Sequence, residues 1–408
     1  MNAYENENTA VVVIGGGYAG VMAANRLTRR KDVTVTLVNP RPDFVHRVRL
    51  HQLVGGSDPA VIAYGDVLAG GVALVVDTVA RIDADDHTLR LASGARLSYD
   101  YLIYAVGSGS AAPTVPGAAE HAYQIATLED AQRLRPALEE APQTAPVTVV
   151  GAGPTGIETA AELAEQGRAV TLVCGGVLGP YLHARGRRSV ARRLARLGVN
   201  IVDGPGTKVT AVTRDSVRLA DDRELRSTVT IWTVGFAVPD LAVRSGLTTD
   251  PLGRLLTDET LTSVDDVRIV AAGDSAAPSG QPLRMSCQAA MPLGARAADT
   301  VLSRIAGEEP ALLNQPFSAQ CISLGRKDGI FQFANRSDIA VWFNIDGGLG
   351  AKLKETVCKV IPKHLADEGA EPGSYSLHLK SGGEARRRRL EAAPHTPAPA
   401  PATADRAA

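Results

Sequence analysis

Two stretches of the chain share one pattern of apolar and polar positions, in which a short apolar run precedes three spaced glycines and a helix of small residues. In the first stretch the apolar run 11–14 precedes Gly15-Gly16-Gly17-Tyr18-Ala19-Gly20. In the second the run 147–150 precedes Gly151-Ala152-Gly153-Pro154-Thr155-Gly156. Runs rich in β-branched residues follow at 33–38 and 169–173 and predict a second strand in each unit. This repeated order predicts an α/β fold with two Rossmann-like units.

The three glycines of each pattern have separate physical tasks. The first allows a tight turn, the second lets a pyrophosphate approach the backbone, and the third lets the helix pack on the strand. The pyrophosphate then lies at the helix N-terminus, where free N–H groups and the helix dipole favour an anion. Two patterns predict two dinucleotides, and a flavin with a nicotinamide is the economical pair. The residues assigned to these sites are Gly15, Gly17, Tyr18, Ala19 and Gly20 in the first unit and Gly151, Gly153, Thr155 and Gly156 in the second.

The rest of the chain divides around these two units. Further strands are predicted at 73–76, at 101–105 and from Arg268 to Gly273-Asp274, and a helix is predicted over about 288–302. Residues 1–118 and 254–310 are predicted to form a flavin-binding domain, and residues 119–253 a nicotinamide-binding domain. Residues 311–378 are predicted to be a smaller C-terminal α+β region.

Residues 379–408 differ in composition from the rest of the chain. They contain an arginine run, Arg386 to Arg389, followed by a Pro-Ala repeat. Such a segment buries too little apolar surface to fold, so we predict a disordered tail with solvated arginines.

Residues 350–361 have the spacing of an amphipathic helix. Apolar residues stand at 353, 357, 360 and 361, with lysines on the other face. A basic amphipathic helix can lie on an anionic membrane surface, but the same pattern describes a helix that packs on its own domain. Pro362 is expected to end this helix early.

Composition and charge limit the class of protein. The 408 residues are 45% hydrophobic and carry a formal net charge of −1, which suits a globular protein and argues against nucleic-acid binding. No apolar run is long enough to predict a spanning helix, and the polar N-terminus lacks a secretory signal, so we expect a cytoplasmic protein. The cysteines are far apart and predict neither a structural metal site nor a local dithiol; they are Cys174, Cys287, Cys321 and Cys358.

Both units lack the acid that usually ends the second strand and accepts hydrogen bonds from ribose hydroxyls. Asn39 stands there in the first unit, where it either contacts the ribose or only forms a turn. Arg41 either pairs with the pyrophosphate or faces solvent. In the second unit the position is Cys174, which leaves the choice between NADH and NADPH open. Three arginines further along either neutralise the 2′-phosphate of NADPH or form the wet face of a helix; they are Arg185, Arg187 and Arg188.

Glu158 is the candidate catalytic residue. It lies two residues after the last glycine of the second pattern, in the first turn of a helix, where the dipole favours a carboxylate. This local stabilisation is one explanation for the residue. The other is that Glu158 faces the nicotinamide or a proton path at the flavin.

Four motifs in order resemble those of flavoproteins with two dinucleotide-binding domains, which are related in fold to glutathione reductase. They are the two glycine patterns, the segment from Tyr99 to Ser108, and Ala272-Gly273-Asp274. The segment from Ser323 to Gly329 resembles the corresponding segment in the branch of this family that contains ferroptosis suppressor protein and, more distantly, type II NADH:quinone oxidoreductases. The resemblance covers roughly residues 10–335 and implies FAD as cofactor and NAD(P)H as cosubstrate.

The resemblance assigns further residues to the flavin. It implies that Ala105 and Gly107 close the first domain around FAD. It implies that Val79 meets the adenine through its backbone. Asp274 would bond the ribityl chain, and Gly273 would permit this approach.

Other residues are assigned to the reacting rings by the same resemblance. The helix that begins near Gln288 and Ala289 would direct its N-terminus at the flavin pyrimidine. Gly235 matches the strand end that lines the nicotinamide site, and Glu158 matches a glutamate often found beside that site.

The disulfide reductases of this fold place cysteines soon after the second strand of the first domain, or as C-x-x-C in the second. Residues 41–53 contain no cysteine, which predicts that the flavin is the only redox centre. His46 and His51 in this segment either line the substrate side of the flavin or are ordinary packed or exposed residues.

These features predict an FAD-dependent NAD(P)H oxidoreductase that passes hydride from NAD(P)H to FAD and then electrons to a quinone-type acceptor, without a redox-active disulfide. Three alternatives stay open: a ferredoxin or rubredoxin reductase, a flavoenzyme that tailors a small aromatic or quinoid metabolite, and an NAD(P)H-responsive redox sensor. Peripheral contact with the inner face of the membrane and a homodimer also stay open.

Overall fold

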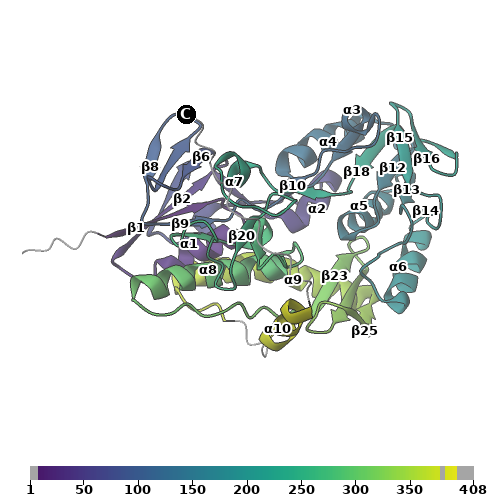
Figure 1. The fold of residues 1–408 in the computed structure, drawn as a ribbon. Coiled ribbons are helices and arrows are strands. Elements are labelled where there is room, and N and C mark those ends of the chain that lie inside the picture. Colours follow the sequence, from purple (N-terminus) through teal and green to yellow (C-terminus); the bar gives the residue numbers. More distant parts are fainter. Residues whose placement is uncertain (1–7, 377–381, 393–408) are drawn as a thin grey trace, which may run out of the picture.

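The computed structural model describes residues 8–376 and 382–392, and it is built on two five-stranded parallel sheets that lie in different halves of the molecule (Figure 1). The first sheet has the order β21-β9-β1-β2-β5. Its strands are Ile269–Ala271, Tyr101–Tyr104, Thr9–Ile14, Val33–Asn39 and Val72–Val76. Because β21 comes from beyond the second sheet in sequence, the chain leaves the first sheet and later returns to complete it.

The second sheet repeats this design with the order β11-β18-β12-β13-β14. Its strands are Ala122–Gln124, Val229–Trp232, Val147–Val150, Val170–Val173 and Asn200–Val202. Helices α4 (Leu128–Glu140), α5 (Pro154–Glu165) and α6 (Ala184–Arg196) accompany it. The predicted α/β class and the two Rossmann-like units are therefore confirmed, with strands and helices within a few residues of the predicted positions.

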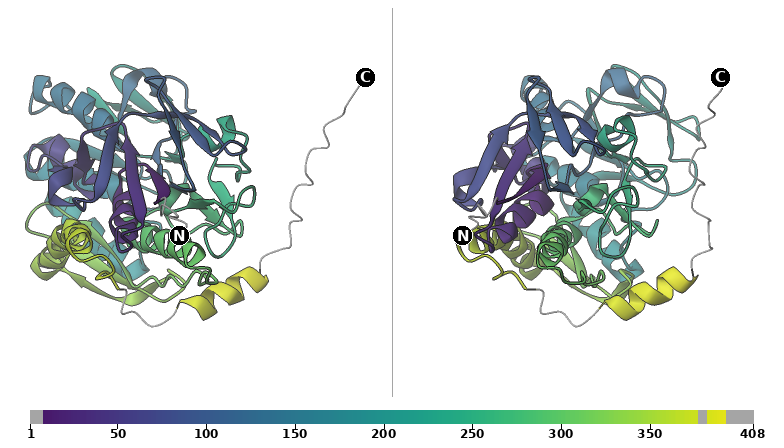
Figure 2. Two further views of the ribbon diagram at one scale, coloured as in Figure 1. Left: turned by 90° about the vertical axis from the view of Figure 1, so that its left-hand side faces the viewer. Right: turned by 60° about the vertical axis from the view of Figure 1, so that its left-hand side comes forward.

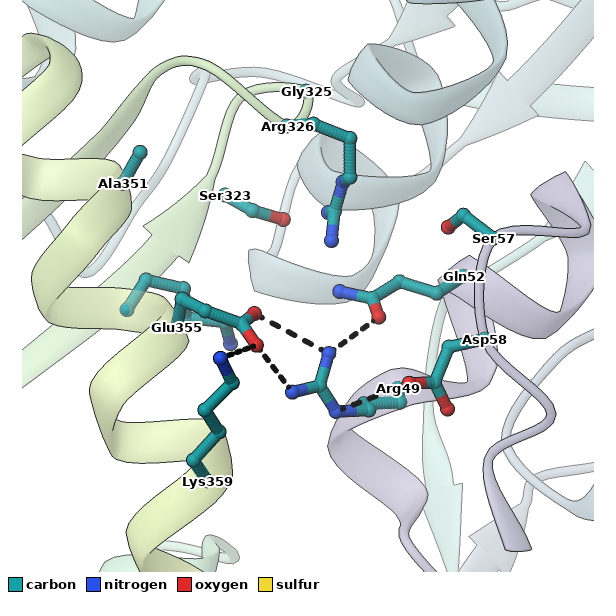
Figure 3. Close-up of a pocket in the computed structure, with 11 residues that line it drawn as sticks. Arg49, Gln52, Ser57, Asp58, Ser323, Gly325, Arg326, Ala351, Glu355 and Lys359 are labelled. Carbon is teal, nitrogen blue, oxygen red and sulfur yellow. Dashed lines mark hydrogen bonds and ion pairs between the residues drawn. The ribbon is translucent and has the colours of Figure 1, made fainter.

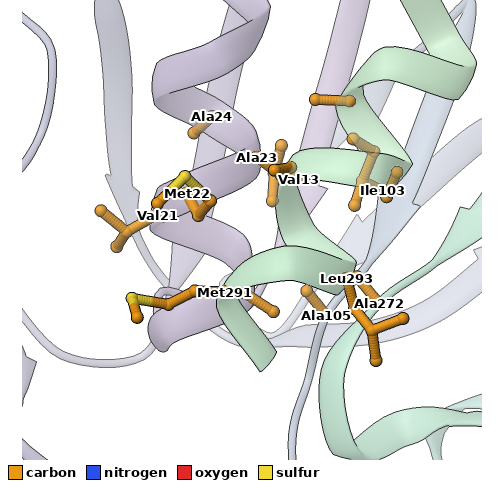
Figure 4. Close-up of a cluster of buried hydrophobic side chains, with 14 of the residues drawn as sticks. Val13, Val21, Met22, Ala23, Ala24, Ile103, Ala105, Ala272, Met291 and Leu293 are labelled. Atoms are coloured by element: carbon orange, nitrogen blue, oxygen red, sulfur yellow. The ribbon is translucent and has the colours of Figure 1, made fainter. Parts of the chain in front are cut away.

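The main core of the first unit lies where α1 (Tyr18–Leu27) and α8 (Cys287–Ile305) cross on the sheet (Figure 4). Small residues bring the two helices into close contact, since a Cβ on Gly294 would lie 2.1 Å from the carbonyl oxygen of Ala19. Met22 and Leu27 are fully buried beside this crossing. The predicted helix over 288–302 is thus confirmed, and Ser286 caps it by accepting a hydrogen bond from the N–H of Ala289.

Smaller strands and helices connect and flank the two sheets. Antiparallel ribbons comprise β6 (Val79–Asp83), β7 (Thr88–Leu91) and β8 (Arg96–Ser98), and β15 (Val209–Val212), β16 (Ser216–Leu219) and β17 (Glu224–Arg226). Paired short strands are β3 (Asp43–Val45) with β4 (Val61–Ala63), β10 (Gly109–Ser110) with β19 (Phe236–Ala237), and β20 (Leu255–Thr257) with β22 (Ala276–Pro278). The short helices are α2 (Leu50–Gly55), α3 (Ala118–His121) and α7 (Leu241–Arg244).

The C-terminal region is an antiparallel sheet followed by one long helix. The sheet has the order β23-β24-β25, with bounds Ala319–Ser323, Gly329–Ala334 and Ala340–Asp346, and α9 spans Gly347–Ala370. The prediction that Pro362 ends this helix is wrong. Proline removes the N–H that would bond to the carbonyl of Cys358, but the His46 ring lies 2.9 Å from that oxygen through Nε2 and replaces the missing donor.

The predicted disordered tail is corrected over residues 383–392, which form α10 (Gly383–Ala392). Figure 2 shows this yellow helix on the outside of the molecule. Arg386 is buried rather than solvated, because its guanidinium group bonds to both carboxylate oxygens of Glu259 and to the carbonyl of Gln281. The other residues of the predicted tail, apart from 382, lie outside the described ranges.

Candidate functional site

The second glycine of each sequence pattern faces open space. A Cβ built on Gly17 or on Gly153 would meet no atom within 4 Å. The first glycine is packed instead, since a Cβ on Gly15 would lie 2.3 Å from the carbonyl oxygen of Ala105. The backbone thus has room for a ligand at the position where a pyrophosphate must approach, in both units.

The two helices that follow these glycines begin without a side-chain cap. Gly17 is the N-cap of α1 and Gly153 is the N-cap of α5, so no side chain accepts from the first N–H groups of either helix. Free N–H donors at a helix N-terminus favour a bound anion. Each unit therefore has the open backbone and the free donors that a dinucleotide pyrophosphate requires.

Asn39 and Arg41 organise the first site from its edge. Asn39 is buried, accepts a 2.9 Å hydrogen bond from the N–H of Gly16 and donates to the carbonyl of Arg41. The Arg41 guanidinium group binds both carboxylate oxygens of Glu129 on α4, which ties the first unit to the second. This pairing is a role for Arg41 other than the two that the sequence suggested, while ribose contact by Asn39 stays a prediction.

Asp274 stands at the junction of the two units. Its Oδ2 accepts a 2.6 Å hydrogen bond from Ser108 and lies 3.6 Å from Nη1 of Arg47. Arg47 also lies over the ring of Phe236, which follows the second sheet. Gly273 has a φ of +71°, a conformation that favours glycine, and a Cβ there would lie 3.0 Å from Cβ of Ala19.

The other predicted cofactor residues keep the backbone positions expected of them. Val79 is buried at the start of β6, and Ala105 directly follows β9. Gly107 and Gly235 both have positive φ, and a Cβ on Gly107 would meet nothing within 4 Å. Gln288 lies in the first turn of α8 with Ala289. Their contacts with a cofactor remain predictions.

Glu158 is buried in a polar cluster that joins three distant parts of the chain. Its Oε1 lies 2.9 Å from Nζ of Lys354 on α9 and accepts a 3.0 Å hydrogen bond from the N–H of Ser323. Nδ1 of His51 lies 3.7 Å from its other oxygen. The side chains of Glu158 and Lys354 are 8% and 9% exposed, so this pair is almost completely removed from water.

The charges of this cluster stabilise one another. Burial alone raises the pKa of Glu158, but the Lys354 ammonium group, with smaller contributions from His51 and Ser323, holds that pKa below its ordinary value. Burial lowers the pKa of Lys354, yet the Glu158 carboxylate holds it well above its ordinary value. Both residues are therefore charged at neutral pH. Burial lowers the pKa of His51 to about 4, so its ring is neutral.

Sequence reasoning missed Lys354 as a site residue and placed it on a solvated face. The available signal was its position in a helical stripe of small and apolar residues, Gly350, Cys358, Ile361 and Leu365, all of which are buried. A lysine at such a position requires a buried acid as its partner. The helix 350–361 accordingly packs on its own protein, with Ile361 buried and Leu353, Val357 and Val360 half-buried.

A cavity of about 410 Å³ lies beside this cluster, and Figure 3 shows the residues that line it. It lies between α2, α9 and the loop after β23, and both Lys354 and Ser323 line it. Arg49 crosses the cavity and pairs with Glu355, with Gln52 beside it (Figure 3). Lys354, the cation that pairs with Glu158, therefore borders a polar cavity.

His46 is held by hydrogen bonds within the protein, and the cysteines form no disulfide in the structure. Because a carbonyl only accepts, Nε2 of His46 carries the hydrogen that bonds to Cys358, and Nδ1 accepts from the hydroxyl of Tyr18 at 3.1 Å. Burial lowers the pKa of His46 to about 4, which agrees with this neutral ring. All four cysteines are free thiols in the structure.

Comparison with known proteins gives oxidoreductases, among them NADH dehydrogenase-like proteins, quinone reductases and a probable ferredoxin reductase. Residues 9–294 match the family described as pyridine nucleotide-disulphide oxidoreductase. An NADH dehydrogenase-like protein of Mycobacterium tuberculosis is 32% identical over 353 residues, which cover 79% of this chain and 87% of that protein. The type II NADH:quinone oxidoreductase Ndh of the same organism is 28% identical over 352 residues, which cover 74% of each chain.

Solved structures share the fold. The sulfide:quinone oxidoreductase of Aquifex aeolicus superimposes with a TM-score of 0.75 at 20% identity and covers 90% of this chain and 93% of its own. NDH2 of Plasmodium falciparum, solved with NADH, superimposes with a TM-score of 0.73 at 16% identity and covers 90% and 99%. At these identities the likeness concerns the fold alone.

Proposed function

The chain belongs to the pyridine nucleotide-disulphide oxidoreductase family, and from this premise we propose that it transfers electrons from NAD(P)H to a quinone. It is an FAD-dependent NAD(P)H oxidoreductase. Its relatives include a type II NADH:quinone oxidoreductase and a demethylphylloquinone reductase, which supports a quinone as acceptor.

The observation that carries the choice of acceptor is the buried Glu158–Lys354 pair beside a polar cavity. NAD(P)H delivers two electrons and one proton as hydride, whereas a quinone needs two electrons and two protons to become a quinol. The second proton has to come from water. An iron–sulfur carrier such as ferredoxin takes an electron only and has no need for a buried proton donor, so the pair favours the quinone over that alternative.

The residues present support the following places for the participants. FAD would lie on the first unit over Gly17, with Asp274 at the junction of the two units. When bound, the flavin would accept a hydride and pass on the electrons. NAD(P)H would dock over Gly153 with its nicotinamide toward Gly235. Glu158 and Lys354 would hold a proton near the acceptor and regain it through the cavity.

The test is anaerobic oxidation of NADH by the purified yellow protein, with menadione and a ferredoxin offered in separate reactions. We expect bleaching of the flavin absorbance by NADH and fast turnover with menadione only. A purified protein without flavin absorbance, or one whose flavin neither NADH nor NADPH bleaches, would overturn the proposed enzyme activity. Fast bleaching with slow turnover on both acceptors would replace the quinone by a dedicated small substrate or a sensor role.

We propose a cytoplasmic location with peripheral membrane contact through the surface around β25. Within the described residues no helix is both long and apolar enough to cross a bilayer. Large apolar side chains are exposed around β25, namely Ile339, Trp342 and Leu349, at 62%, 63% and 58%. The interface between a membrane and water favours such aromatic and aliphatic groups. Cosedimentation with anionic vesicles should fall in Trp342→Ser, and equal binding by this variant would exclude that surface.

A further inference from the structure

We propose that Asp203 makes this enzyme select NADH over NADPH. The sequence left this choice open because Cys174 stands where the end of β13 usually carries an acid. In the structure a carboxylate lies one strand further along, directly after β14. This inference rests on the proposed function for the docking of a nicotinamide dinucleotide on the second unit.

The register of the sheet places Asp203 beside the end of β13. Strands β13 and β14 are parallel, and Val173 pairs with Val202, so Cys174 and Asp203 occupy the next matching positions. The N–H of Cys174 donates to the carbonyl of Val202 at 2.8 Å. Burial and the nearby Asp203 carboxylate together raise the pKa of the Cys174 thiol to about 12. The missing acid is thus supplied by the neighbouring strand.

A cavity beside Asp203, lined by its neighbour Gly204, suits the adenosine end of a dinucleotide. Two loops, 175–177 and 204–206, line a cavity of about 360 Å³ and are held together by a 2.6 Å bond from the N–H of Gly204 to the carbonyl of Gly176. A Cβ on Gly175, Gly176 or Gly204 would meet nothing within 4 Å. Asp203 is exposed and directly precedes the second of these loops, at the sheet edge where such ligands bind.

Two of the three arginines that could have neutralised a 2′-phosphate contact other groups, and the third, Arg188, is exposed on α6. The Arg185 guanidinium group lies over the ring of Trp342 in the C-terminal sheet. Arg187 donates to the carbonyl of Leu182. Among the described residues that line the cavity, the cation is Lys208. A ribose 2′-hydroxyl can donate to the Asp203 carboxylate, whereas a 2′-phosphate carries up to two negative charges and is repelled by it.

The test compares binding of ADP-ribose and its 2′-phosphorylated form by calorimetry to the flavin-loaded protein. The wild type should prefer ADP-ribose, and Asp203→Asn should lower the ratio of the two affinities about tenfold, which is the usual loss for a hydrogen bond to a charged group. Asp85→Asn, an exposed aspartate in the first unit, removes the same charge and should leave the ratio unchanged. Lys208→Met should raise the preference for ADP-ribose.

Two outcomes would overturn the inference. One is an unchanged affinity ratio in Asp203→Asn, and the other is a wild type that prefers the 2′-phosphorylated fragment. Because fragment binding requires neither hydride transfer nor an acceptor, these results are separate from failure of the proposed function, which would appear as absent flavin bleaching with both nucleotides. The ratio of kcat/KM for NADH and NADPH should change in parallel in the same variants.

Discussion

At the scale of single residues, the pair Glu158–Lys354 removes two opposite charges from water within one contact. Each ion alone would be costly to bury, and the 2.9 Å approach together with the Ser323 N–H offsets that cost. The free energy of the pair therefore depends on both partners. Loss of one partner leaves the other as an isolated buried charge.

Lys354→Met is expected to lower the free energy of unfolding by about 3–5 kcal/mol, because Glu158 is left buried without its cation. The double variant Glu158→Gln/Lys354→Met should lose much less, since no buried charge remains. Urea unfolding of the four proteins of this cycle measures the coupling. Lys359→Met removes an exposed lysine from the same helix and should change stability by less than about 1 kcal/mol.

The pH dependence of these variants has a definite sign. In the wild type the lowered pKa of Glu158 contributes stability above the ordinary glutamate pKa, and this contribution is lost as the pH falls through the pKa of the folded protein. Without Lys354 burial raises that pKa, so the destabilisation of Lys354→Met should be smaller at pH 5 than at pH 8. Equal destabilisation at both pH values would contradict a charged Glu158.

Glu158→Gln should also change the pH profile of quinone reduction.

Gly153→Val tests which unit binds which nucleotide. The Cβ meets no protein atom and φ is −73°, so the substitution should fold normally and keep FAD. Its branched side chain would fill the space of the nicotinamide pyrophosphate and weaken NADH binding by at least about tenfold, equivalent to about 1.4 kcal/mol. Stopped-flow bleaching over a range of NADH concentrations measures this. Gly70→Val, at another open glycine, is the control, and loss of flavin in Gly153→Val would reverse the assignment.

At the scale of elements, the two C-terminal helices depend on partners from distant segments. The long helix α9 passes through Pro362 because His46, from the first unit, bonds to the carbonyl that proline leaves free. Helix α10 is attached through Arg386, which binds Glu259 and two backbone carbonyls. Neither helix is explained by its own sequence, since each relies on a hydrogen bond that tertiary packing supplies.

The substitution His46→Phe is expected to cost about 1–3 kcal/mol, because the carbonyl of Cys358 loses its donor inside the protein. In a Pro362→Ala background the alanine N–H can bond to that carbonyl, so His46→Phe should cost clearly less there. The bond to Tyr18 is lost in both backgrounds and cancels in the comparison. Chemical unfolding of the four proteins gives the coupling free energy, and an equal cost in both backgrounds would show that the His46–Cys358 bond does not support the helix.

At the scale of the whole molecule, α2 joins the two units into one body. It belongs to the segment between strands of the first sheet, yet its residues Leu50, Leu53 and Val54 lie in the same buried cluster as Ile157 and Leu163 of α5. The pairs Arg41–Glu129 and Ser57–Glu162 cross the same boundary. Relative motion of the two units would have to expose this cluster.

Leu53→Ala should therefore destabilise both units together. Leu53 is 8% exposed, and its truncation is expected to cost about 2–4 kcal/mol through lost burial and a residual cavity. Thermal unfolding followed by far-ultraviolet circular dichroism and by flavin fluorescence should shift to lower temperature with both probes. Val76→Ala, at an exposed valine of the first sheet, should change neither. A shift in one probe only would indicate that the units unfold independently.

The elements with strong local signals followed from the sequence. The glycine patterns, the β-branched strands and the helix after Ser286 are short-range features, because turn geometry, side-chain periodicity and capping act within a few residues. The proposed cofactor-facing roles of Gly17 and Gly153 follow from spacing alone, and the structure leaves room at both. Asn39 and Arg41 were only partly predictable, since their partners Gly16 and Glu129 come from different ranges of the chain.

By itself the sequence determined the α/β class, the two dinucleotide units and the residues that mark them, because these depend on backbone conformation within single supersecondary units. Only the tertiary structure decided that Lys354 is buried against Glu158, that α9 continues past Pro362 and that Asp203 stands beside Cys174. Each of these facts is a contact between segments far apart in the chain. Buried charges and freed carbonyls take whichever partner the packed fold brings within hydrogen-bond distance, and local sequence patterns carry no record of that partner.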